Sequence, residues 1–255
     1  MSQRFALLER RWLEAREVGL LGPAPVEDHI EHSLAFAEAL DDVSDGSTAP
    51  HRIVDLGSGA GVPGLVLATL KPETRVMLLD GSARRAEWLR LTVMALDLPN
   101  VEVVCARAEE TGRQPAHRGH AHAVVARAFG PPGVTAECAA PLLRVGGLLL
   151  VSELPAEPRG GSDVMPEEDG KQMASTDRWV PEGLRELGLG RAQVVVRRGR
   201  RFVAMVQESS CPERYPRRVG IPQKRPLFPL APAAPAAPPS RRTGTPPSGG
   251  AGRTS

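Results

Sequence analysis

The stretch RIVDLGSGAGVPG, residues 52–64, decides the fold of this chain. Its apolar run ends in Asp55 and then breaks into Gly57, Gly59 and Gly61, a pattern typical of a strand that turns sharply into a helix. In an open α/β sheet, ligands bind at the turn that follows the carboxyl end of such a strand. Glycines there let the backbone approach the ligand, because no Cβ stands in the way. The stretch therefore predicts a small-molecule site at the first strand of an α/β sheet.

The acidic residues near this turn distinguish two classes of ligand. Dinucleotides are held by GxGxxG, whereas the glycines here follow GxGxG, and Asp55 would repel a pyrophosphate. S-adenosylmethionine has no phosphate and carries an ammonium and a sulfonium group, so an aspartate suits it. Asp80 ends the second predicted strand, where a carboxylate can accept both ribose hydroxyls, and Glu109 follows the third strand, placed to border the adenine. We therefore expect S-adenosylmethionine as the cofactor.

Apolar runs alternate with helical stretches along the rest of the chain. RVMLLD, VEVVCA, AVVARAF and GGLLLVS are typical of strands, and helical spacing spans 83–96 and 131–144. This alternation predicts an α/β, Rossmann-like fold with a mostly parallel sheet, to which a hairpin turning at Gly199 adds an antiparallel edge. The predicted parts are an N-terminal helical segment (1–50), the main domain (51–228) with an exposed loop at 154–177, and a disordered Pro/Ala/Gly-rich tail (229–255).

Composition limits the compartment and the partners of this 255-residue chain. Lys and Arg total 32 against 30 Asp and Glu, a net charge of +2, so attraction to nucleic acid must come from a local patch. Cys105, Cys138 and Cys211 lie far apart, which favours a reducing compartment, and the first two are interpreted as small buried apolar residues. No apolar run reaches the roughly 20 residues that cross a bilayer. We expect a cytoplasmic protein that does not enter a membrane.

Three histidines in HRGHAH, residues 117–122, have the spacing of metal ligands. They fall in an expected loop without a nearby acid or cysteine, so we expect no metal site.

A basic run near the end of the sequence is the best candidate for contact with nucleic acid. Between residues 197 and 225, only Glu208 and Glu213 oppose the cations Arg197, Arg198, Arg200, Arg201, Arg214, Arg217, Arg218, Lys224 and Arg225. Such a run is typical of an RNA-facing surface, and the alternative is a solvated hairpin turn and tail. Tyr215, the lone tyrosine, offers one stacking surface within the run.

Arg127 and Phe129 follow the fourth predicted strand at the same edge of the sheet. The planar guanidinium of Arg127 suits either the cofactor carboxylate or a target phosphate, and the alternative is an ordinary surface arginine. Phe129 could stack on a target base, but a phenylalanine beside a strand end is more often part of the core.

Five segments together carry a resemblance to a known family. These segments are VDLGSGAGVPGLVLA, LLDGSARRAEWLR, RAEE, VVARAF and RYPRRVGIPQKRPL. Through them the chain resembles the bacterial 16S rRNA guanine-N7 methyltransferases of the glucose-inhibited-division-B type over about residues 26–228. The resemblance implies a class I methyltransferase fold and transfer of a methyl group from S-adenosylmethionine to N7 of a guanosine in 16S rRNA or the small ribosomal subunit. It implies cofactor contacts at Gly57, Val62, Ala108, Glu109 and Arg127, beside the Asp55, Gly59, Gly61 and Asp80 already named. To the RNA we assign Arg127, Arg217, Arg218, Lys224 and Arg225, and we expect a monomer.

The chain departs from that family at places that bear on the substrate. VGLLGPAP stands where the family has Asn-Leu-Thr, His32 replaces an acid in the helix that carries His29, and Ser152 with Glu153 replace Lys-Gly. An anion in place of a cation weakens attraction to phosphate, so another RNA or a small molecule remains an alternative substrate. A cofactor-sensing ribosome-binding protein without turnover is a third possibility. Guanine N7 has an exposed lone pair, so its methylation needs alignment rather than a general base, and we expect no catalytic acid or base.

Overall fold

The structure, a computed structural model, describes residues 2–43, 51–153, 176 and 178–228. The tail predicted at 229–255 and most of the loop predicted at 154–177 lie outside the described residues. No helix in the described ranges combines the length and apolar character needed to cross a membrane.

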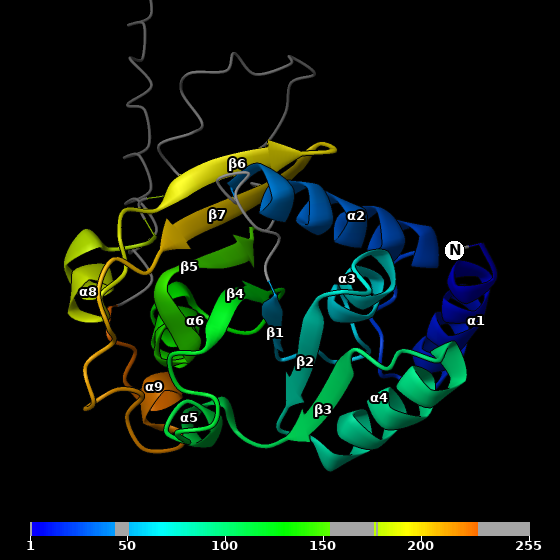
Figure 1. Cartoon of the computed structure of the whole chain (residues 1–255), viewed down its shortest axis with the longest axis horizontal. Helices are drawn as coiled ribbons and strands as arrows, with labels where there is room; N and C mark the ends of the chain where they lie inside the picture. Colours follow the sequence, from blue (N-terminus) through cyan, green and yellow to red (C-terminus); the bar gives the residue numbers. More distant parts are fainter. Residues whose placement is uncertain (1, 44–50, 154–175, 177, 229–255) are drawn as a thin grey trace, which may run out of the picture.

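A single sheet organises the described part of the molecule (Figure 1). Its strands are β1 (Arg52–Leu56), β2 (Arg75–Asp80), β3 (Val101–Cys105), β4 (Ala121–Ala126), β5 (Leu143–Ser152), β6 (Gln193–Arg197) and β7 (Arg200–Val206). They stand in the order β3-β2-β1-β4-β5-β7-β6; the first five run parallel, and β7 pairs antiparallel with β5 and β6. The predicted mostly parallel sheet with an antiparallel edge hairpin is confirmed, and the hairpin turns at Gly199 as expected.

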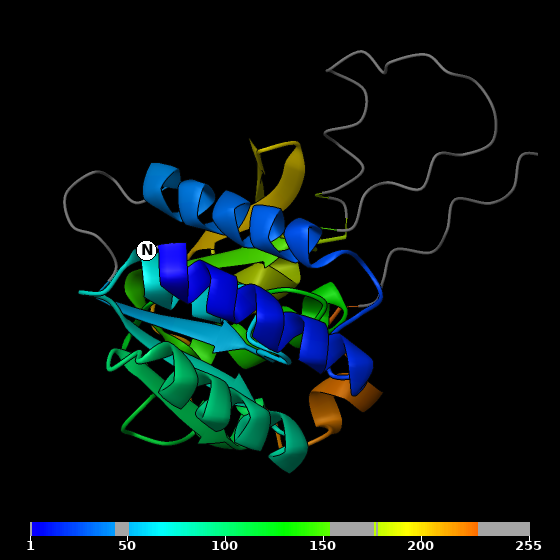
Figure 2. The same ribbon diagram turned by 90° about the vertical axis from the view of Figure 1, so that its right-hand side faces the viewer.

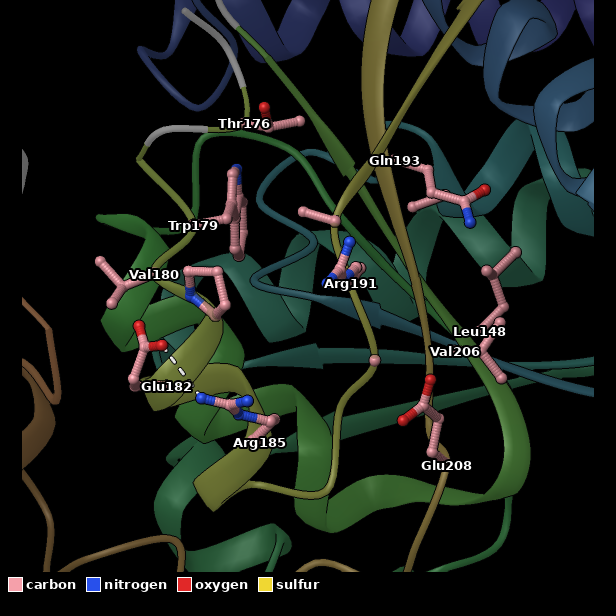
Figure 3. Close-up of a pocket in the computed structure, with 14 residues that line it drawn as sticks. Leu148, Thr176, Trp179, Val180, Glu182, Arg185, Arg191, Gln193, Val206 and Glu208 are labelled. Atoms are coloured by element: carbon pink, nitrogen blue, oxygen red, sulfur yellow. Dashed lines mark hydrogen bonds and ion pairs between the residues drawn. The ribbon is translucent and has the colours of Figure 1, made fainter. Parts of the chain in front are cut away.

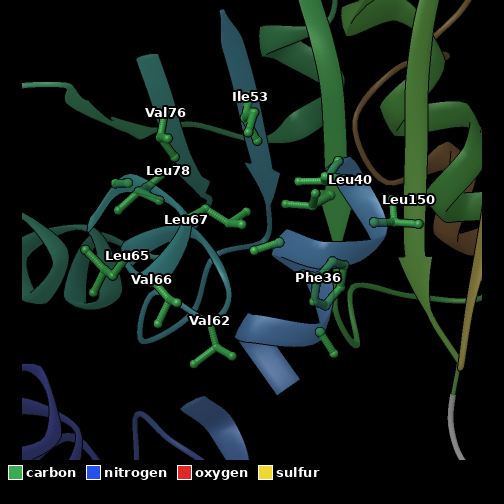
Figure 4. Packing of buried hydrophobic residues seen from close by; sticks show 14 of the residues in the cluster. Phe36, Leu40, Ile53, Val62, Leu65, Val66, Leu67, Val76, Leu78 and Leu150 are labelled. Carbon is green, nitrogen blue, oxygen red and sulfur yellow. The ribbon is translucent and has the colours of Figure 1, made fainter. Parts of the chain in front are cut away.

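Helices cover both faces of this sheet. One face carries α1 (Ser2–Glu17), α2 (Val26–Val43), α3 (Gly64–Leu70) and α4 (Ala83–Leu96), and Figure 2 shows α1 between α2 and α4. The other face carries α5 (Ala108–Thr111), α6 (Pro132–Ala139), α8 (Pro181–Glu186) and α9 (Ile221–Lys224). Strand side chains alternate between the two layers. Ile53, Leu78 and Leu150 therefore pack with α2 and α3 in a first core (Figure 4), while Val54 and Leu79 pack with α6 and α8 in a second core.

The ends of two helices can be compared with the ends predicted from the sequence. The helix predicted at 83–96 is α4, and the Ser82 hydroxyl caps it by accepting a hydrogen bond from the Arg85 N–H. The helix predicted at 131–144 is shorter, since α6 ends at Ala139 and a 3-10 turn, Ala140–Leu142, leads into β5. Pro141 has no N–H to continue the α-helical hydrogen bonds, which explains the early end.

The N-terminal helix supports the glycine turn directly. Trp12 of α1 is fully buried, and its indole N–H donates to the carbonyl of Ala60 at 2.9 Å. The segment predicted at 1–50 thus shares a core with the sheet.

The cysteines differ in their environment. Cys138 in α6 is buried as predicted, but Cys105 at the end of β3 is exposed, so the prediction of a buried residue is wrong there. The reason is topological: β3 is the outermost parallel strand and pairs only with β2 within the described sheet.

Candidate functional site

The glycine turn after β1 is shaped by its lack of side chains. Gly57 and Gly61 have positive φ angles of 75° and 95°. A Cβ on Gly57 would lie 2.6 Å from the ring of Phe129, and one on Gly61 would lie 2.3 Å from Leu65. A larger residue at either position would push apart the turn and the elements packed on it.

A cavity of about 510 Å³ opens beside this turn at the carboxyl ends of β1, β2 and β3. It brings together four of the predicted cofactor residues, Gly57, Asp80, Ala108 and Glu109. Its other lining residues include Arg85, Arg107, Phe129, Val134, Cys138 and Gln223. The remaining predicted cofactor residues, Asp55, Gly59, Gly61, Val62 and Arg127, do not line it, and the side chain of Val62 packs into the first core.

Asp80 at the end of β2 holds the turn in place. Its carboxylate is buried, and it accepts hydrogen bonds at 2.9 Å from the N–H of Gly59 and, on its other oxygen, from the N–H of Ser82. The Arg85 guanidinium lies 3.7 Å away. Because each carboxylate oxygen has two lone pairs, both retain capacity for the hydroxyls of a ligand.

Glu109 ties the cavity to the C-terminal part of the chain. One of its oxygens accepts hydrogen bonds from the Gly220 N–H at 2.9 Å and from the Arg107 guanidinium at 3.3 Å. Burial by itself would raise the pKa of Glu109, but these hydrogen bonds outweigh it and hold the pKa below its ordinary value. Glu109 is therefore an anion at neutral pH.

Asp55 lies behind the turn rather than in the cavity. Its Oδ2 accepts a hydrogen bond from the Gly64 N–H at 3.0 Å, at the start of α3, and its Oδ1 is buried without a hydrogen-bond partner among the described residues. Burial raises the pKa of Asp55 to about 7, and the charge of Asp80 adds to the shift. A cation placed next to Oδ1 would restore the ionised carboxylate.

Arg127 follows β4 and reaches the first face of the sheet. Its guanidinium donates to Nδ1 of His29 on α2 at 2.9 Å. Burial and the nearby Arg200 both lower the pKa of Arg127, while Asp55 opposes them. No carboxylate lies within ion-pair distance of Arg127 among the residues that the structure describes. A partly buried cation without a counter-ion is suited to an anionic ligand.

Phe129, which the sequence analysis assigned to the core rather than to base stacking, is half-buried and lies against the glycine turn. It packs at the edge of the second core and also lines the cavity. Gln223 was missed by the sequence analysis, because nothing in its local sequence separates it from the basic residues on either side. It reaches the cavity only because α9 folds back against α6.

The basic run divides into two structurally different parts. In the β6–β7 hairpin, three arginines meet acids of α2: Arg197 pairs with Asp42, Arg198 with Glu31 and Glu38, and Arg200 with Asp28. Arg201 has no ion pair among the residues that the structure describes. In the C-terminal segment, residues 211–228, the exposed side chains of Arg218, Lys224 and Arg225 have no ion pair within the described part of the chain.

Two residues predicted for RNA contact are engaged inside the protein. The N–H and guanidinium of Arg217 donate to Glu137 of α6 at 2.5 to 2.8 Å, and Glu137 is fully buried. Tyr215 is buried and donates its hydroxyl hydrogen to Glu186 at 2.8 Å, so the prediction that it offers a free stacking surface is wrong.

Glu153 is neutralised by its surroundings. Its carboxylate accepts hydrogen bonds from Arg178 at 3.0 Å and from the indole N–H of Trp179 at 2.8 Å. Trp179 belongs to the second core, whereas Arg127 faces α2 on the opposite side of the sheet. The weaker attraction to phosphate that was expected from Glu153 therefore loses its structural basis, because the carboxylate is already paired with Arg178.

The histidines of HRGHAH are dispersed. His117 contacts the Arg52 guanidinium at 3.1 Å, and His122 packs edge-on against His51. Within the described ranges, no group of three or more possible ligands is arranged to hold a metal ion.

A larger cavity, about 930 Å³, lies between α8 and the strands β5, β6 and β7 (Figure 3). Apolar side chains such as Leu148 and Val206 form part of its wall, and the Glu182–Arg185 ion pair stands on α8 beside it. It contains none of the predicted site residues, and its lining comes from α8, the middle of β5 and the antiparallel hairpin rather than from the ends of β1 to β4. Despite its greater volume, it is the weaker candidate, since α/β folds bind ligands at those strand ends.

Comparisons with known proteins identify the family and the fold of the chain. A profile of the family described as rRNA small subunit methyltransferase G matches residues 16–153. The chain is 36% identical over 230 residues to the ribosomal RNA small subunit methyltransferase G of Rubrobacter xylanophilus, a match covering 89% of this chain and 83% of the relative. The protein of the same name from Deinococcus deserti is 39% identical over 181 residues, which cover 70% of this chain and 69% of that protein.

A solved methyltransferase structure from Geobacter sulfurreducens shares the fold, with a TM-score of 0.50 and 13% identity over 79% of this chain and 90% of the other. At that identity the likeness concerns the fold alone, and it agrees with the predicted class I methyltransferase architecture.

Proposed function

The chain belongs to the rRNA small subunit methyltransferase G family, and from that premise we propose that it transfers a methyl group from S-adenosylmethionine to N7 of a guanosine in 16S rRNA. One observation carries the proposal: the cavity beside the glycine turn brings Asp80 and Glu109 together and is bordered by a segment whose exposed cations have no ion pair among the described residues. The two carboxylates suit the cofactor, and the cations of the segment suit an RNA backbone.

The cofactor half of the proposal rests on the chemistry of the carboxylates. Asp80 would accept the ribose hydroxyls, while Ala108 and Glu109 would border the adenine. Asp55 lies behind this cavity and would support the turn from below, since its Oδ2 accepts a hydrogen bond from the Gly64 N–H at the start of α3. The turn of Gly57, Gly59 and Gly61 would let the cofactor approach the backbone closely.

The RNA half rests on the exposed cations. Arg218, Lys224 and Arg225 would contact phosphates, whose neutralisation releases counter-ions and supplies sequence-independent affinity. Arg127, which is held by His29 on the α2 side of the sheet, would bind an anionic group of either ligand. Arg217 instead anchors the segment through Glu137, so we assign it a structural role.

When bound, S-adenosylmethionine supplies a methyl group on a sulfonium, which is electrophilic without further activation. The N7 lone pair of guanine needs no deprotonation, so the protein contributes alignment. The glycine turn and Asp80 would fix the cofactor, and Phe129 would limit the space beside it. The cofactor would thus supply the reactive group and the protein would supply alignment, as expected of a site built from hydrogen-bonding and packing residues.

We further propose that the protein acts as a monomer in the cytoplasm. Ribosomal RNA is found there, and size-exclusion chromatography with light scattering would test the monomer.

Transfer of labelled methyl from S-adenosylmethionine to small-subunit rRNA, taken from cells that lack this gene, tests the function. The expected result is a single labelled N7-methylguanosine after nuclease mapping. Incorporation into another RNA or into a metabolite would point to a changed substrate. Binding of the cofactor without any incorporation would point to a cofactor-sensing ribosome-binding protein, and either result would contradict the proposal.

A further inference from the structure

A histidine on α2 holds the guanidinium that follows β4. His29 and Arg127 are 98 residues apart in sequence, yet Nδ1 of His29 lies 2.9 Å from the terminal nitrogen of Arg127. Arginine has only donors, so the histidine nitrogen must be the acceptor, and the ring is therefore neutral with its proton on Nε2. This contact joins the first helical layer to the carboxyl edge of the sheet.

The surroundings of His29 favour its neutral form. The residue is only 2% exposed, and the edge of its ring packs against Trp12 of α1. Burial lowers the pKa of His29, as do Arg127 after β4 and Arg16 of α1; the main chain of Gly22 and Asp28 of α2 oppose the shift without reversing it. An uncharged acceptor thus faces Arg127 near neutral pH.

Arg127 has donor capacity left over after this contact. A guanidinium carries five N–H donors, and the only side chain recorded as accepting from it in the described part of the chain is His29. Arg200 contributes a second positive charge nearby. The guanidinium is therefore held on one side by a neutral ring, while the rest of its fork remains available for an anion.

We propose that His29 is a positioning residue for Arg127: by accepting one hydrogen bond, it fixes the guanidinium so that its remaining donors meet an anionic group of the bound ligands. That group is the carboxylate of the cofactor or a phosphate of the RNA. The inference rests on the proposed function for the identity of these ligands, but the His29–Arg127 contact itself does not.

His32, one turn further along α2, provides a matched control. Its ring packs against Phe36 and Phe202 with centroid distances of 5.4 and 5.8 Å. Burial lowers the pKa of His32 to about 4, so it is also neutral. Unlike His29, it has no recorded hydrogen bond to Arg127 among the described contacts.

The experiment compares three full-length variants with the wild type. His29→Phe keeps a ring but removes the acceptor, His29→Asn replaces Nδ1 with an amide oxygen, and His32→Phe is the control. Calorimetry measures the Kd of S-adenosylhomocysteine and of 5′-methylthioadenosine, which shares the adenosine and thioether but lacks the amino acid. Fluorescence anisotropy measures the Kd of small-subunit rRNA at fixed salt, and thermal unfolding reports the fold.

If Arg127 holds the carboxylate, His29→Phe weakens S-adenosylhomocysteine binding about tenfold, as expected for loss of a hydrogen bond to a charged group, and leaves 5′-methylthioadenosine unaffected. If Arg127 holds a phosphate, only the RNA Kd rises by a similar factor. In both cases His29→Asn restores most of the lost affinity, and His32→Phe matches the wild type.

Unchanged affinities in a folded His29→Phe variant would overturn the inference, as would a His29→Asn variant no better than His29→Phe. An equal loss in His32→Phe would also overturn it, since the effect would then come from packing of α2. These binding measurements do not require turnover, so a failure of the proposed methylation reaction shows separately as absent methyl incorporation.

Discussion

The β6–β7 hairpin and the C-terminal segment carry equally basic sequences, yet the fold uses their charges differently. Arg197 and Arg198 lie against the acids of α2, which runs beside the hairpin (Figure 1). The C-terminal segment has one buried pair, Arg217 with Glu137, and leaves Arg218 and Lys224 exposed. A stretch of positive sequence is thus a candidate RNA surface only where the fold supplies no acid opposite it.

Within the C-terminal segment, some residues hold the segment to the rest of the protein and others are free to contact RNA. Arg118 donates to the carbonyls of Cys211, Pro212 and Tyr215, at 2.8 to 3.0 Å, and fixes the beginning of the segment. Glu109 then accepts from Gly220 at 2.9 Å, further along. These contacts hold the exposed cations close to the mouth of the cavity, where a target nucleotide would have to enter.

The largest effect on stability is expected from Arg217→Met, which removes the ion pair that holds the C-terminal segment to α6. It leaves Glu137 as a buried charge without its guanidinium, and breaking such a pair costs about 3 kcal/mol in the free energy of unfolding. Urea denaturation followed by fluorescence measures the loss. Arg218→Met, on the exposed neighbouring residue, serves as the control and should change stability by less than about 0.5 kcal/mol.

A second variant distinguishes the ion pair from simple loss of packing. Arg217→Met combined with Glu137→Leu removes both charges and should recover part of the lost stability, because replacing a buried pair with apolar groups is often nearly neutral. A double variant no more stable than Arg217→Met would show that the charge of Glu137 is not the source of the loss.

A smaller, functional effect is expected when the exposed cations are removed. Arg218→Ala with Lys224→Ala should weaken binding of small-subunit rRNA roughly tenfold, and should flatten the dependence of log Kd on log salt by about 0.7 to 0.9 per lost phosphate contact. Titrations at several salt concentrations measure both quantities. The Kd of S-adenosylhomocysteine should not change.

The matched charge change in the hairpin is Arg197→Ala with Arg198→Ala. It removes the same number of positive charges but should leave the rRNA Kd within about twofold, because α2 already neutralises these residues. Equal losses in the two double variants would mean that net charge, rather than placement, governs RNA binding.

These contrasts mark what the sequence could and could not predict. The strands, the glycine turn and α4 follow from local patterns: apolar runs, three alternating glycines, and Ser82 before a helical stretch. Asp80 and Glu109 could be placed together because the carboxyl ends of parallel strands meet at one edge. Local pattern and topology were enough to bring Gly57, Asp80, Ala108 and Glu109 to one cavity, but not to tell that Asp55 and Arg127 lie outside its lining.

Pairing between distant segments could not be predicted from those rules. Arg198 meets Glu38 across 160 residues, Arg127 meets His29 across 98, and Arg217 meets Glu137 across 80. No local periodicity encodes such partners. Glu153 illustrates the same limit, because its apparent conflict with phosphate disappears once Arg178 and Trp179 are seen to donate hydrogen bonds to its carboxylate.

The smallest effect is expected from Arg198→Ala alone. Glu38 and Glu31 both raise the pKa of Arg198, but the guanidinium is well exposed, and exposed pairs contribute little to stability. The melting temperature should fall by no more than about 2 °C at low salt, and the difference should vanish near 1 M salt, where charges are screened over about 3 Å. A large fall that persists at high salt would mean that the hairpin is anchored to α2 by its arginine stems and apolar contacts rather than by charge. Arg198 and Arg217 would then differ in how their side chains pack rather than in how their charges are paired. The hairpin would be a structural part of the α2 layer.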